Sequence, residues 1–406
     1  MTRIEKKLGF LYCIIAALST LAINHSDSTL PERDYIIYFH SISLISLIYS
    51  CFLIQKNGFI CHHKGLFFIF IFWWLIITFY RYDQSTINLG ILTFSTLLMF
   101  CYLRKKVIYQ AFSYYINYIT IMSCLGIFAY TCMVFNINVP MTICPYYGVR
   151  LGDSFLYFDY YYSYIVIEGA YARLCGLFNE PGYFGTFLSL CLIANGLNFN
   201  DKRNLILMIA GCLTFSAAFF ITLILYFVFL AIIRKNYYIV LIACVILISI
   251  NTIEFDNVNI IRLMDRLTFE DGKLTAINRT SNSFDHLFSK VLASSDVFWG
   301  YGGGYLVSND YVGSLSYKRD IIEYGLFACI IYWGSLFVKG IHSAQKNITA
   351  VVFVILFMVN IYQRPGIFVA GYMLIFLGGI YRIVYNEQEY RTHFMAENKV
   401  RISSTE

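Results

Sequence analysis

Long apolar stretches follow one another along most of this chain, and short polar connections separate them. A helix needs about 20 mainly apolar residues to cross a lipid bilayer, so each such stretch is a candidate span. The pattern predicts twelve transmembrane helices, at residues 8–24, 35–54, 66–81, 86–103, 112–135, 182–199, 203–215, 217–233, 237–251, 320–338, 348–363 and 366–385. We therefore expect an all-α polytopic integral membrane protein that forms a single transmembrane domain over residues 1–406.

One apolar run, residues 204–233, is too long for a single span. As one helix it would measure about 45 Å, whereas a bilayer core is about 30 Å thick. Two short spans with a turn at Thr214-Phe215-Ser216 fit better, and only this arrangement places most basic residues of the short loops on one side, together with the N-terminus. Because cytoplasmic loops collect Lys and Arg, we expect both termini in the cytoplasm, with a tail at 386–406.

Two long polar segments, 136–181 and 252–319, then lie outside the cytoplasm. In the second segment, apolar residues recur at helical spacing over 258–269 and 280–293. Amphipathic helices of this kind lie in the plane of the membrane interface. Polar chemistry is therefore expected in these two outer segments, or at the membrane depth beside them.

The composition excludes two classes of protein. Of the 406 residues, 59% are hydrophobic and 13% are charged, whereas a soluble domain carries about 25% charged residues. A water-soluble enzyme and a disordered chain are both excluded, because the first needs more polar surface and the second fewer apolar residues. Basic inner loops explain the net charge of +6, so no nucleic-acid partner is expected. The chain has no CxxC pair and no Asp-x-Asp cluster, which predicts neither a metal site nor a redox motif.

The first outer segment is rich in tyrosine, including Tyr160 and Tyr161. These rings suit an interfacial aromatic belt, and they equally suit a platform that binds sugars. Pro181 is typical of the first turn of a helix, so Glu180 is expected at or near the N-cap of the next span. With Arg173 just upstream, this is either a helix start with an ion pair or an acid–base and anion site at the membrane surface.

The second outer segment contains a glycine-rich stretch, 299–305, that includes Tyr301 and Tyr305. Contiguous glycines allow the backbone to approach a ligand closely, although no Gly-Lys-Ser/Thr follows and a nucleotide site is not indicated. Asp285 and His286 lie on the predicted amphipathic helix as possible proton acceptors. Glu323 stands one turn inside the next span, and its carboxylate is interpreted as reaching back to the membrane surface.

The order of these motifs is shared with a known family. They are Arg173-x-x-Gly176-x-x-x-Glu180-Pro181 before a span, Arg279 ahead of an amphipathic helix, Gly300-Tyr301-Gly302, and Glu323-Tyr324-Gly325-Leu326. In this order, and in its two dominant outer loops, the whole chain resembles the O-antigen polymerase (Wzy) family. The resemblance implies a glycosyltransferase of GT-C-like layout in the inner membrane of a bacterium.

The resemblance also implies a substrate, which is an oligosaccharide repeat unit linked to undecaprenyl diphosphate. A growing glycan would move from its carrier to the non-reducing end of another lipid-linked unit. The leaving diphosphate needs charge neutralisation, for which arginine is suited, and the outer candidates are Arg150, Arg173, Arg279, Arg319 and Arg364. The acceptor hydroxyl needs a base, for which the candidates are Glu180 first, then His286, Asp285 and Asp310. The sugar-binding candidates are Tyr160, Tyr161, Tyr301 and Tyr305. We expect no metal and no cofactor, because arginine replaces the cation.

Other functions remain open at this stage. Membrane lipid, a chain-length regulator and a flippase of the same pathway are the expected partners of a polymerase. An O-antigen ligase or an exopolysaccharide polymerase of the same fold is one alternative. A flippase or transporter of the same lipid-linked units is another, since twelve spans suit it, but a transporter should carry ionisable residues near mid-membrane and internal repeats. Here the predicted spans carry almost no charged residues near their middle, and no internal repeat is clear.

Overall fold

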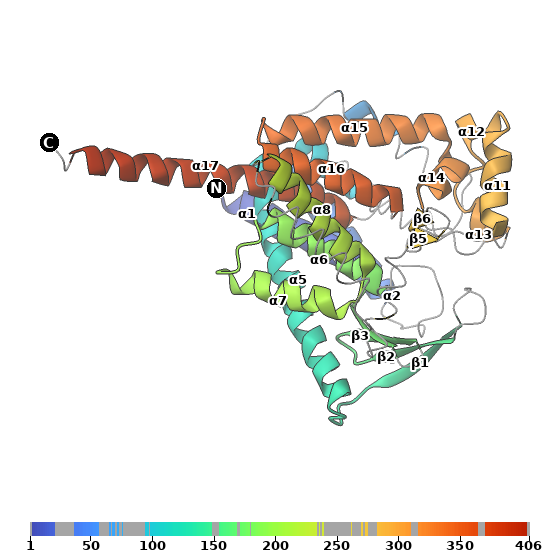
Figure 1. The fold of residues 1–406 in the computed structure, drawn as a ribbon. Helices are drawn as coiled ribbons and strands as arrows, with labels where there is room; N and C mark the ends of the chain where they lie inside the picture. Colours follow the sequence, from blue (N-terminus) through green and yellow to red (C-terminus); the bar gives the residue numbers. More distant parts are fainter. Residues whose placement is uncertain are drawn as a thin grey trace.

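The structure is a computed structural model, and it describes residues 2–20, 36–56, 65, 67–69, 71–72, 75, 94–96, 98–147, 154–168, 171–178, 180–233, 235, 238, 261, 269–270, 273–274, 282–309, 316–363 and 370–403. The named helices are α1 (Arg3–Ser19), α2 (Ile36–Lys56), α5 (Lys105–Val134), α6 (Pro181–Ala194), α7 (Lys202–Leu213), α8 (Ala217–Ile233), α11 (Asn282–Leu292), α12 (Asp296–Trp299), α13 (Tyr305–Ser308), α14 (Tyr317–Tyr324), α15 (Leu326–Ala344), α16 (Ile348–Gln363) and α17 (Ala370–Ser403). The strands are β1 (Thr142–Tyr147), β2 (Ser154–Asp159), β3 (Tyr164–Glu168), β4 (Tyr171–Gly176), β5 (Phe269–Glu270) and β6 (Lys273–Leu274) (Figure 1).

Helix α6 lies at the centre of the helix bundle. All of its residues are buried, and it packs against α7, α8, α16, α17 and β4. The ring of Phe187 on α6 lies 5.4 Å from the ring of Tyr372 on α17. Helix α17 also approaches α5 closely, because a Cβ added to Gly378 would lie 2.4 Å from the Cβ of Phe112, and small residues allow such contact. The last part of α17 leaves the bundle and projects away from it (Figure 1).

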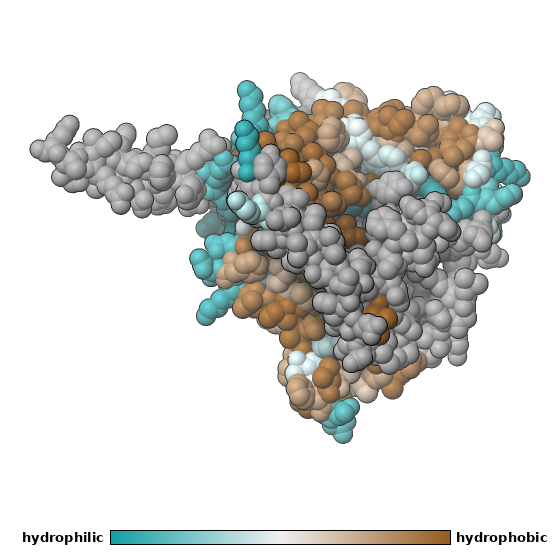
Figure 2. Space-filling model, in the orientation of Figure 1, coloured by the Kyte–Doolittle hydropathy of each residue, from teal (hydrophilic) through white to brown (hydrophobic). Residues whose placement is uncertain are grey.

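Two of the described helices, α5 and α15, are long and apolar enough to cross a membrane. Helix α15 also exposes a row of large apolar side chains, which are Phe327, Ile330, Ile331, Phe337 and Val338. Figure 2 shows hydrophobic residues over α15 and hydrophilic ones at the edge of the molecule near α11. Apolar surface of this extent suits contact with lipid. Membrane association through α5 and α15 is the part of the twelve-span prediction that the structure supports.

Helices α6 and α7 match the predicted spans at 182–199 and 203–215 in position but not in length. They contain 14 and 12 residues, which rise only about 21 Å and 18 Å, against a bilayer core of about 30 Å. Their connection is held by side chains inside the protein. The amide of Asn195 donates to Asn204 Oδ1 at 2.8 Å, and Arg382 of α17 donates to Asn195 Oδ1 at 3.1 Å. Such partners allow a helix hairpin to end inside a bundle.

The first outer segment contains a β-sheet, which corrects the prediction of an all-α chain. Strands β1, β2, β3 and β4 pair in that order as an antiparallel meander. The segment is dense in aromatic and β-branched residues, which favour strands, whereas its tyrosines were interpreted only as a belt or a platform. At the turn between β2 and β3, the Tyr161 amide donates to Asp159 Oδ1 at 2.7 Å, so a side chain closes the turn.

The long apolar run is broken where the sequence predicts a turn. Helix α7 ends at Leu213 and α8 begins at Ala217, and Phe215 between them has a φ of 44°. A second break is not predicted by the sequence. The expected span at 320–338 is divided into α14 and α15 at Gly325, whose φ is 82°.

The amphipathic helix predicted at 280–293 is confirmed as α11, but its apolar face packs on protein. Phe284 and Val291 are fully buried, and α11 contacts α12 and α14. The ring of Phe288 lies 6.2 Å from the ring of Tyr317 on α14. Protein therefore covers most of the face that the sequence assigned to the membrane interface, and Leu292 at its end stays exposed. The helix predicted at 258–269 and the spans predicted at 66–81 and 237–251 lie largely outside the described residues, and half of the span predicted at 86–103 is described.

Candidate functional site

The Arg173 side chain connects the β-sheet, through hydrogen bonds, to the turn between α7 and α8. It lies on β4, opposite Val166 of β3, and is 8% exposed. Its Nε donates to the carbonyl oxygen of Thr214 at 3.1 Å, and its Nη2 donates to that of Phe215 at 3.4 Å. The last carbonyls of a helix lack partners within the helix and form its negative end, so a cation is stabilising there. The two hydrogen bonds thus fix the position of Arg173, which the sequence predicts to bind phosphate, on β4 beside this turn.

Glu180 begins α6, as the sequence predicts. It is the N-cap residue, with extended backbone angles of φ −140° and ψ 142°, and Pro181 follows in the first turn. The main-chain carbonyl of Glu180 accepts hydrogen bonds from the amides of Tyr183 and Phe184, each at 3.1 Å. Its carboxylate does not cap the helix. The backbone therefore holds this carboxylate beside the positive end of α6 without using it as a cap.

The buried thiol of Cys175 shows that Arg173 and Glu180 share one neighbourhood. Burial raises the pKa of this thiol most strongly, the positive charge of Arg173 lowers it, and the negative charge of Glu180 raises it. Because charge interactions weaken with distance, both charges lie within electrostatic range of the same sulfur atom. The two predicted site residues lie on elements that contact each other, Arg173 on β4 and Glu180 at the start of α6, and the Arg173 side chain joins β4 to the turn between α7 and α8.

The glycine-rich stretch of the second outer segment and the glycine motif that opens the next predicted span are joined through their main chains. The amide of Tyr301 donates to the carbonyl of Ile322 at 2.7 Å, and the amide of Gly302 donates to that of Glu323, also at 2.7 Å. The stretch at 299–305 is thus joined to the end of α14. The motifs that carry the family resemblance in this segment are adjacent in space.

The stretch at 299–305 passes close to the end of α14, and two glycines make this close approach possible. We call this contact between the two main chains the glycine crossing. Gly300 and Gly325 both have positive φ, 70° and 82°. A Cβ on Gly300 would lie 2.6 Å from the carbonyl oxygen of Glu323, and a Cβ on Gly325 would lie 2.4 Å from that of Phe298. Neither position has room for a side chain. These glycines serve close packing of backbone on backbone.

An ion pair with a buried carboxylate lies on α14, beside the glycine crossing. Arg319 Nε is 3.3 Å from Glu323 Oε2, and the Arg319 side chain is 37% exposed while that of Glu323 is 2% exposed. Asp320 is buried as well. Neither Asp320 Oδ2 nor Glu323 Oε1 accepts a hydrogen bond from the described residues. Burial raises the pKa of Asp320 well above its usual value, against the lowering effect of Arg319, and Glu323 raises it further.

Sequence reasoning assigned neither of these acidic residues to the site. Glu323 was interpreted as reaching back to the membrane surface, but its carboxylate is buried, which corrects that interpretation. The available signal was Gly325, which ends α14 directly after Glu323 and Tyr324. A glycine at that point predicts a helix end, and so places Glu323 in a separate short helix before the apolar α15.

The four candidate sugar-binding tyrosines differ in exposure. Tyr161, at the turn between β2 and β3, is 57% exposed, and its hydroxyl lies 3.3 Å from Thr142 Oγ1. Tyr160 beside it is buried. Tyr301 and Tyr305 are half-buried and stack on each other, with ring centroids 4.5 Å apart. Tyr161 therefore presents the most ring surface to a solvent-borne ligand.

The remaining candidates are separated or fall outside the described residues. Asp285 is engaged by Lys318, whose Nζ donates to Asp285 Oδ1 at 2.6 Å, and His286 is exposed on the same helix. Arg150, Arg279, Arg364 and Asp310 lie outside the described residues. Of the predicted phosphate ligands, the structure therefore places Arg173 and Arg319.

These two arginines belong to different layers on the same side of the molecule. Arg173 lies where the sheet meets α6, and Arg319 lies on α14, which packs against α11, α12, α15 and α16. Figure 1 shows the sheet and α11–α14 on the side away from both termini. In the described part of the chain, no group of three His, Cys, Asp or Glu side chains is placed to hold a metal ion. The described candidate residues provide guanidinium groups and carboxylates for binding and proton transfer.

Comparison with known proteins identifies no relative of this chain. No protein-family model, no curated protein and no solved structure matches it. Function is therefore inferred from the residues themselves and from the order of their motifs.

Proposed function

We propose that the protein is a membrane glycosyltransferase that polymerises oligosaccharide repeat units carried on undecaprenyl diphosphate, at the outer face of a bacterial inner membrane. The observation that carries the proposal is geometric: Arg173 lies on β4 and is bonded to the break between α7 and α8, and β4 packs against α6, whose N-cap is Glu180. This place is the junction of a β-sheet with a bundle of apolar helices. A cation beside a carboxylate suits a substrate whose phosphates lie at the bilayer surface and whose hydroxyl groups lie just above it.

The proposed reaction breaks one bond, forms one bond and moves one proton. The bond between the anomeric carbon of the growing glycan and the carrier diphosphate breaks, and the acceptor hydroxyl oxygen bonds to that carbon. The hydroxyl proton passes to Glu180, and the diphosphate leaves with its lipid. Arg173 stabilises the charge that develops on the diphosphate.

The distribution of basic residues supports an orientation with both termini in the cytoplasm. Arg104, directly before α5, pairs with Glu5 of α1 at 3.3 Å, so the starts of these two helices lie together. At its other end, α5 contacts the sheet, where the Tyr130 hydroxyl donates to the carbonyl of Ala172 at 3.3 Å. Because basic loops stay in the cytoplasm, the sheet then faces outward, as a site for lipid-linked glycans requires.

The test uses the purified full chain and a defined repeat unit on undecaprenyl diphosphate. The wild-type protein is expected to convert this unit into a ladder of longer glycans. Glu180→Gln removes the base, and Arg173→Lys removes the fork of N–H groups but keeps the charge. We expect each to lower the polymerisation rate by about 100-fold or more. Lys290→Gln, which changes an exposed charged side chain on α11, is the control and should retain full activity.

Thermal unfolding separates lost chemistry from lost folding in these variants. Glu180→Gln should lower the unfolding temperature only slightly, because losing a negative charge beside the start of a helix costs about 0.3–1 kcal/mol. Full polymerisation by both Glu180→Gln and Arg173→Lys would overturn the site assignment. Movement of lipid-linked units across vesicles without any ladder would establish the transporter instead.

A further inference from the structure

Three aromatic side chains form an exposed cluster where α12 meets the start of α15. The ring of Phe298 stacks on that of Phe327 with centroids 4.9 Å apart, and the ring of Trp299 meets Phe327 edge to face at 5.7 Å. Trp299 is nevertheless 69% exposed, and Phe298 and Phe327 are 41% and 49% exposed. We call these three residues the aromatic corner. Its rings hold one another in place while much of their apolar surface stays uncovered.

The aromatic corner continues into an apolar face of α15. After Phe327, exposed large apolar residues recur at i+3, i+4, i+10 and i+11, and they are Ile330, Ile331, Phe337 and Val338. This spacing places them on one side of the helix. Helix α15 is long and apolar enough to cross a membrane, and its 19 residues rise about 29 Å, close to the thickness of a bilayer core. The row therefore suits contact with lipid, and the aromatic corner lies at one end of it (Figure 1).

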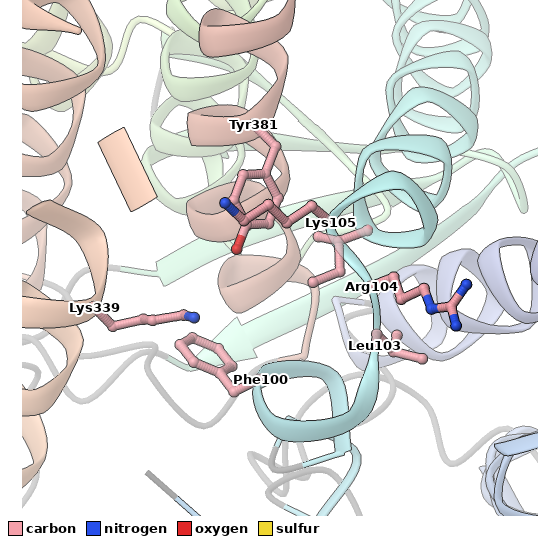
Figure 3. Close-up of a pocket in the computed structure, with 7 residues that line it drawn as sticks. Phe100, Leu103, Arg104, Lys105, Lys339 and Tyr381 are labelled. Carbon is pink, nitrogen blue, oxygen red and sulfur yellow. The ribbon is translucent and has the colours of Figure 1, made fainter. Parts of the chain in front are cut away.

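The two ends of α15 differ in chemistry. Near its last turns, Lys339 lines a pocket together with Arg104 and Lys105 at the start of α5 (Figure 3). Basic residues gather on the cytoplasmic side of membrane proteins. The aromatic corner is at the opposite end of α15, so it belongs to the outer surface in the orientation given above.

Polar groups adjoin the aromatic corner and limit how deeply it can enter a bilayer. Asp296, in the same short helix as Trp299, is exposed and accepts a hydrogen bond from the Tyr301 hydroxyl at 3.1 Å. An exposed carboxylate is costly in the hydrocarbon core. Tryptophan is enriched at the boundary between headgroups and hydrocarbon, because its ring is apolar and its N–H group seeks a polar partner.

We propose that the aromatic corner docks on the lipid bilayer, with the Trp299 ring at the level of the outer headgroups. The glycine crossing holds this contact in place, because Gly300 directly follows Trp299 and Gly325 lies two residues before Phe327. The segment α11–α14 is thereby anchored to the membrane surface, although protein covers most of the apolar face of α11. The proposal rests on α15 crossing the membrane, and it does not depend on the proposed glycosyl transfer.

Depth-dependent quenching of tryptophan fluorescence tests the proposal. The purified full chain is reconstituted into phosphatidylcholine vesicles that carry a nitroxide either near the glycerol end or at the tail end of the acyl chain. The contribution of Trp299 is the signal that is lost in Trp299→Phe, a conservative change of an exposed side chain. We expect the glycerol-end nitroxide to quench this contribution at least about twofold more strongly than the tail-end nitroxide, because interfacial indoles lie near the headgroups.

Trp333 provides a depth control on the same helix. It is half-buried and lies six residues after Phe327, which places it about 9 Å further along α15. Its contribution, obtained from Trp333→Phe, should be quenched more strongly by the tail-end nitroxide. Melting temperatures in the same vesicles verify that both variants are folded.

Three results would overturn the proposal. If neither nitroxide quenches Trp299 while both quench Trp333, the aromatic corner faces water or protein. If the tail-end nitroxide quenches Trp299 as strongly as Trp333, the ring lies in the hydrocarbon core and not at the headgroups. If Trp333 is not quenched either, α15 does not face lipid and the basis of the proposal is lost. Shielding of Trp299 that disappears when the protein is diluted with lipid would assign the aromatic corner to a second copy of the chain instead.

Discussion

Replacing Gly325 with alanine should disrupt the glycine crossing and destabilise the protein. Its backbone angles are φ 82° and ψ 158°, a region that is almost restricted to glycine, and alanine there costs about 1–3 kcal/mol. The added Cβ would also lie 2.4 Å from the carbonyl oxygen of Phe298. Because both groups belong to backbone, one of the two chains must move.

The movement puts the two main-chain hydrogen bonds of the crossing at risk. They are made by the amides of Tyr301 and Gly302, each at 2.7 Å, and each is worth about 1 kcal/mol net. Strain and lost bonds together predict that Gly325→Ala destabilises the protein by roughly 3–5 kcal/mol. Loss of the two main-chain hydrogen bonds should also disturb the ion pair of Arg319 and Glu323, which lies on α14 just before the glycine crossing.

Unfolding of the full chain in detergent, followed by temperature or by denaturant, measures this effect. Two glycines serve as controls. A Cβ on Gly334, inside α15, meets nothing within 4 Å, so Gly334→Ala should be neutral or stabilising by up to about 1 kcal/mol. Gly196 has a φ of 77° but equally open surroundings, so Gly196→Ala isolates backbone strain, at about 1–2 kcal/mol.

The reasoning fails if Gly325→Ala is as stable as Gly334→Ala. It fails in part if Gly325→Ala loses no more than Gly196→Ala, because the close contact with Phe298 would then contribute nothing. A double variant adds a further check. Gly300→Ala with Gly325→Ala should cost less than the sum of the single changes, since both act on the same crossing.

Three further changes test other parts of the structure. Asp320 has a raised pKa in the folded protein. Its contribution to stability is therefore present below the ordinary pKa of aspartate and is lost as pH rises through the raised value. Asp320→Asn should make the melting temperature fall less steeply as pH rises. Arg382 donates to the Tyr109 hydroxyl at 2.7 Å and to Asn195 Oδ1 at 3.1 Å, so Arg382→Met should cost about 2–4 kcal/mol in unfolding, and a cost below about 1 kcal/mol would contradict its bridging role. Lys318 pairs with Asp285 in a partly exposed position, so Lys318→Gln should cost less than about 1 kcal/mol, and a larger loss would mean that the pair is a structural anchor.

Local rules predicted those features that depend on neighbouring residues. Pro181 marked the start of α6, and Glu180 is its N-cap as expected. The turn at 214–216 followed from comparing the length of the apolar run with the thickness of a bilayer, and the helices break there. The apolar periodicity of 280–293 likewise predicted α11. Each of these needed only propensity, length or period.

Features that depend on distant contacts were not predictable in the same way. The spacing of apolar residues in α11 gives its face but not its partner, and α12 and α14 cover that face. Tyrosines suit a membrane interface, a sugar platform and a strand alike, so composition did not reveal the sheet. The contact of Arg173 with Thr214 joins residues 41 positions apart. Burial of Glu323 depends on the glycine crossing, which no local pattern shows.

The most direct test of the proposed function is a single reaction. The purified protein is mixed with one defined repeat unit on undecaprenyl diphosphate, and the products are separated by size. Polymerisation predicts a ladder of glycans, each longer by one unit, with free undecaprenyl diphosphate released in equal amount to the linkages formed. Unchanged single units, in the presence of folded protein, would contradict it.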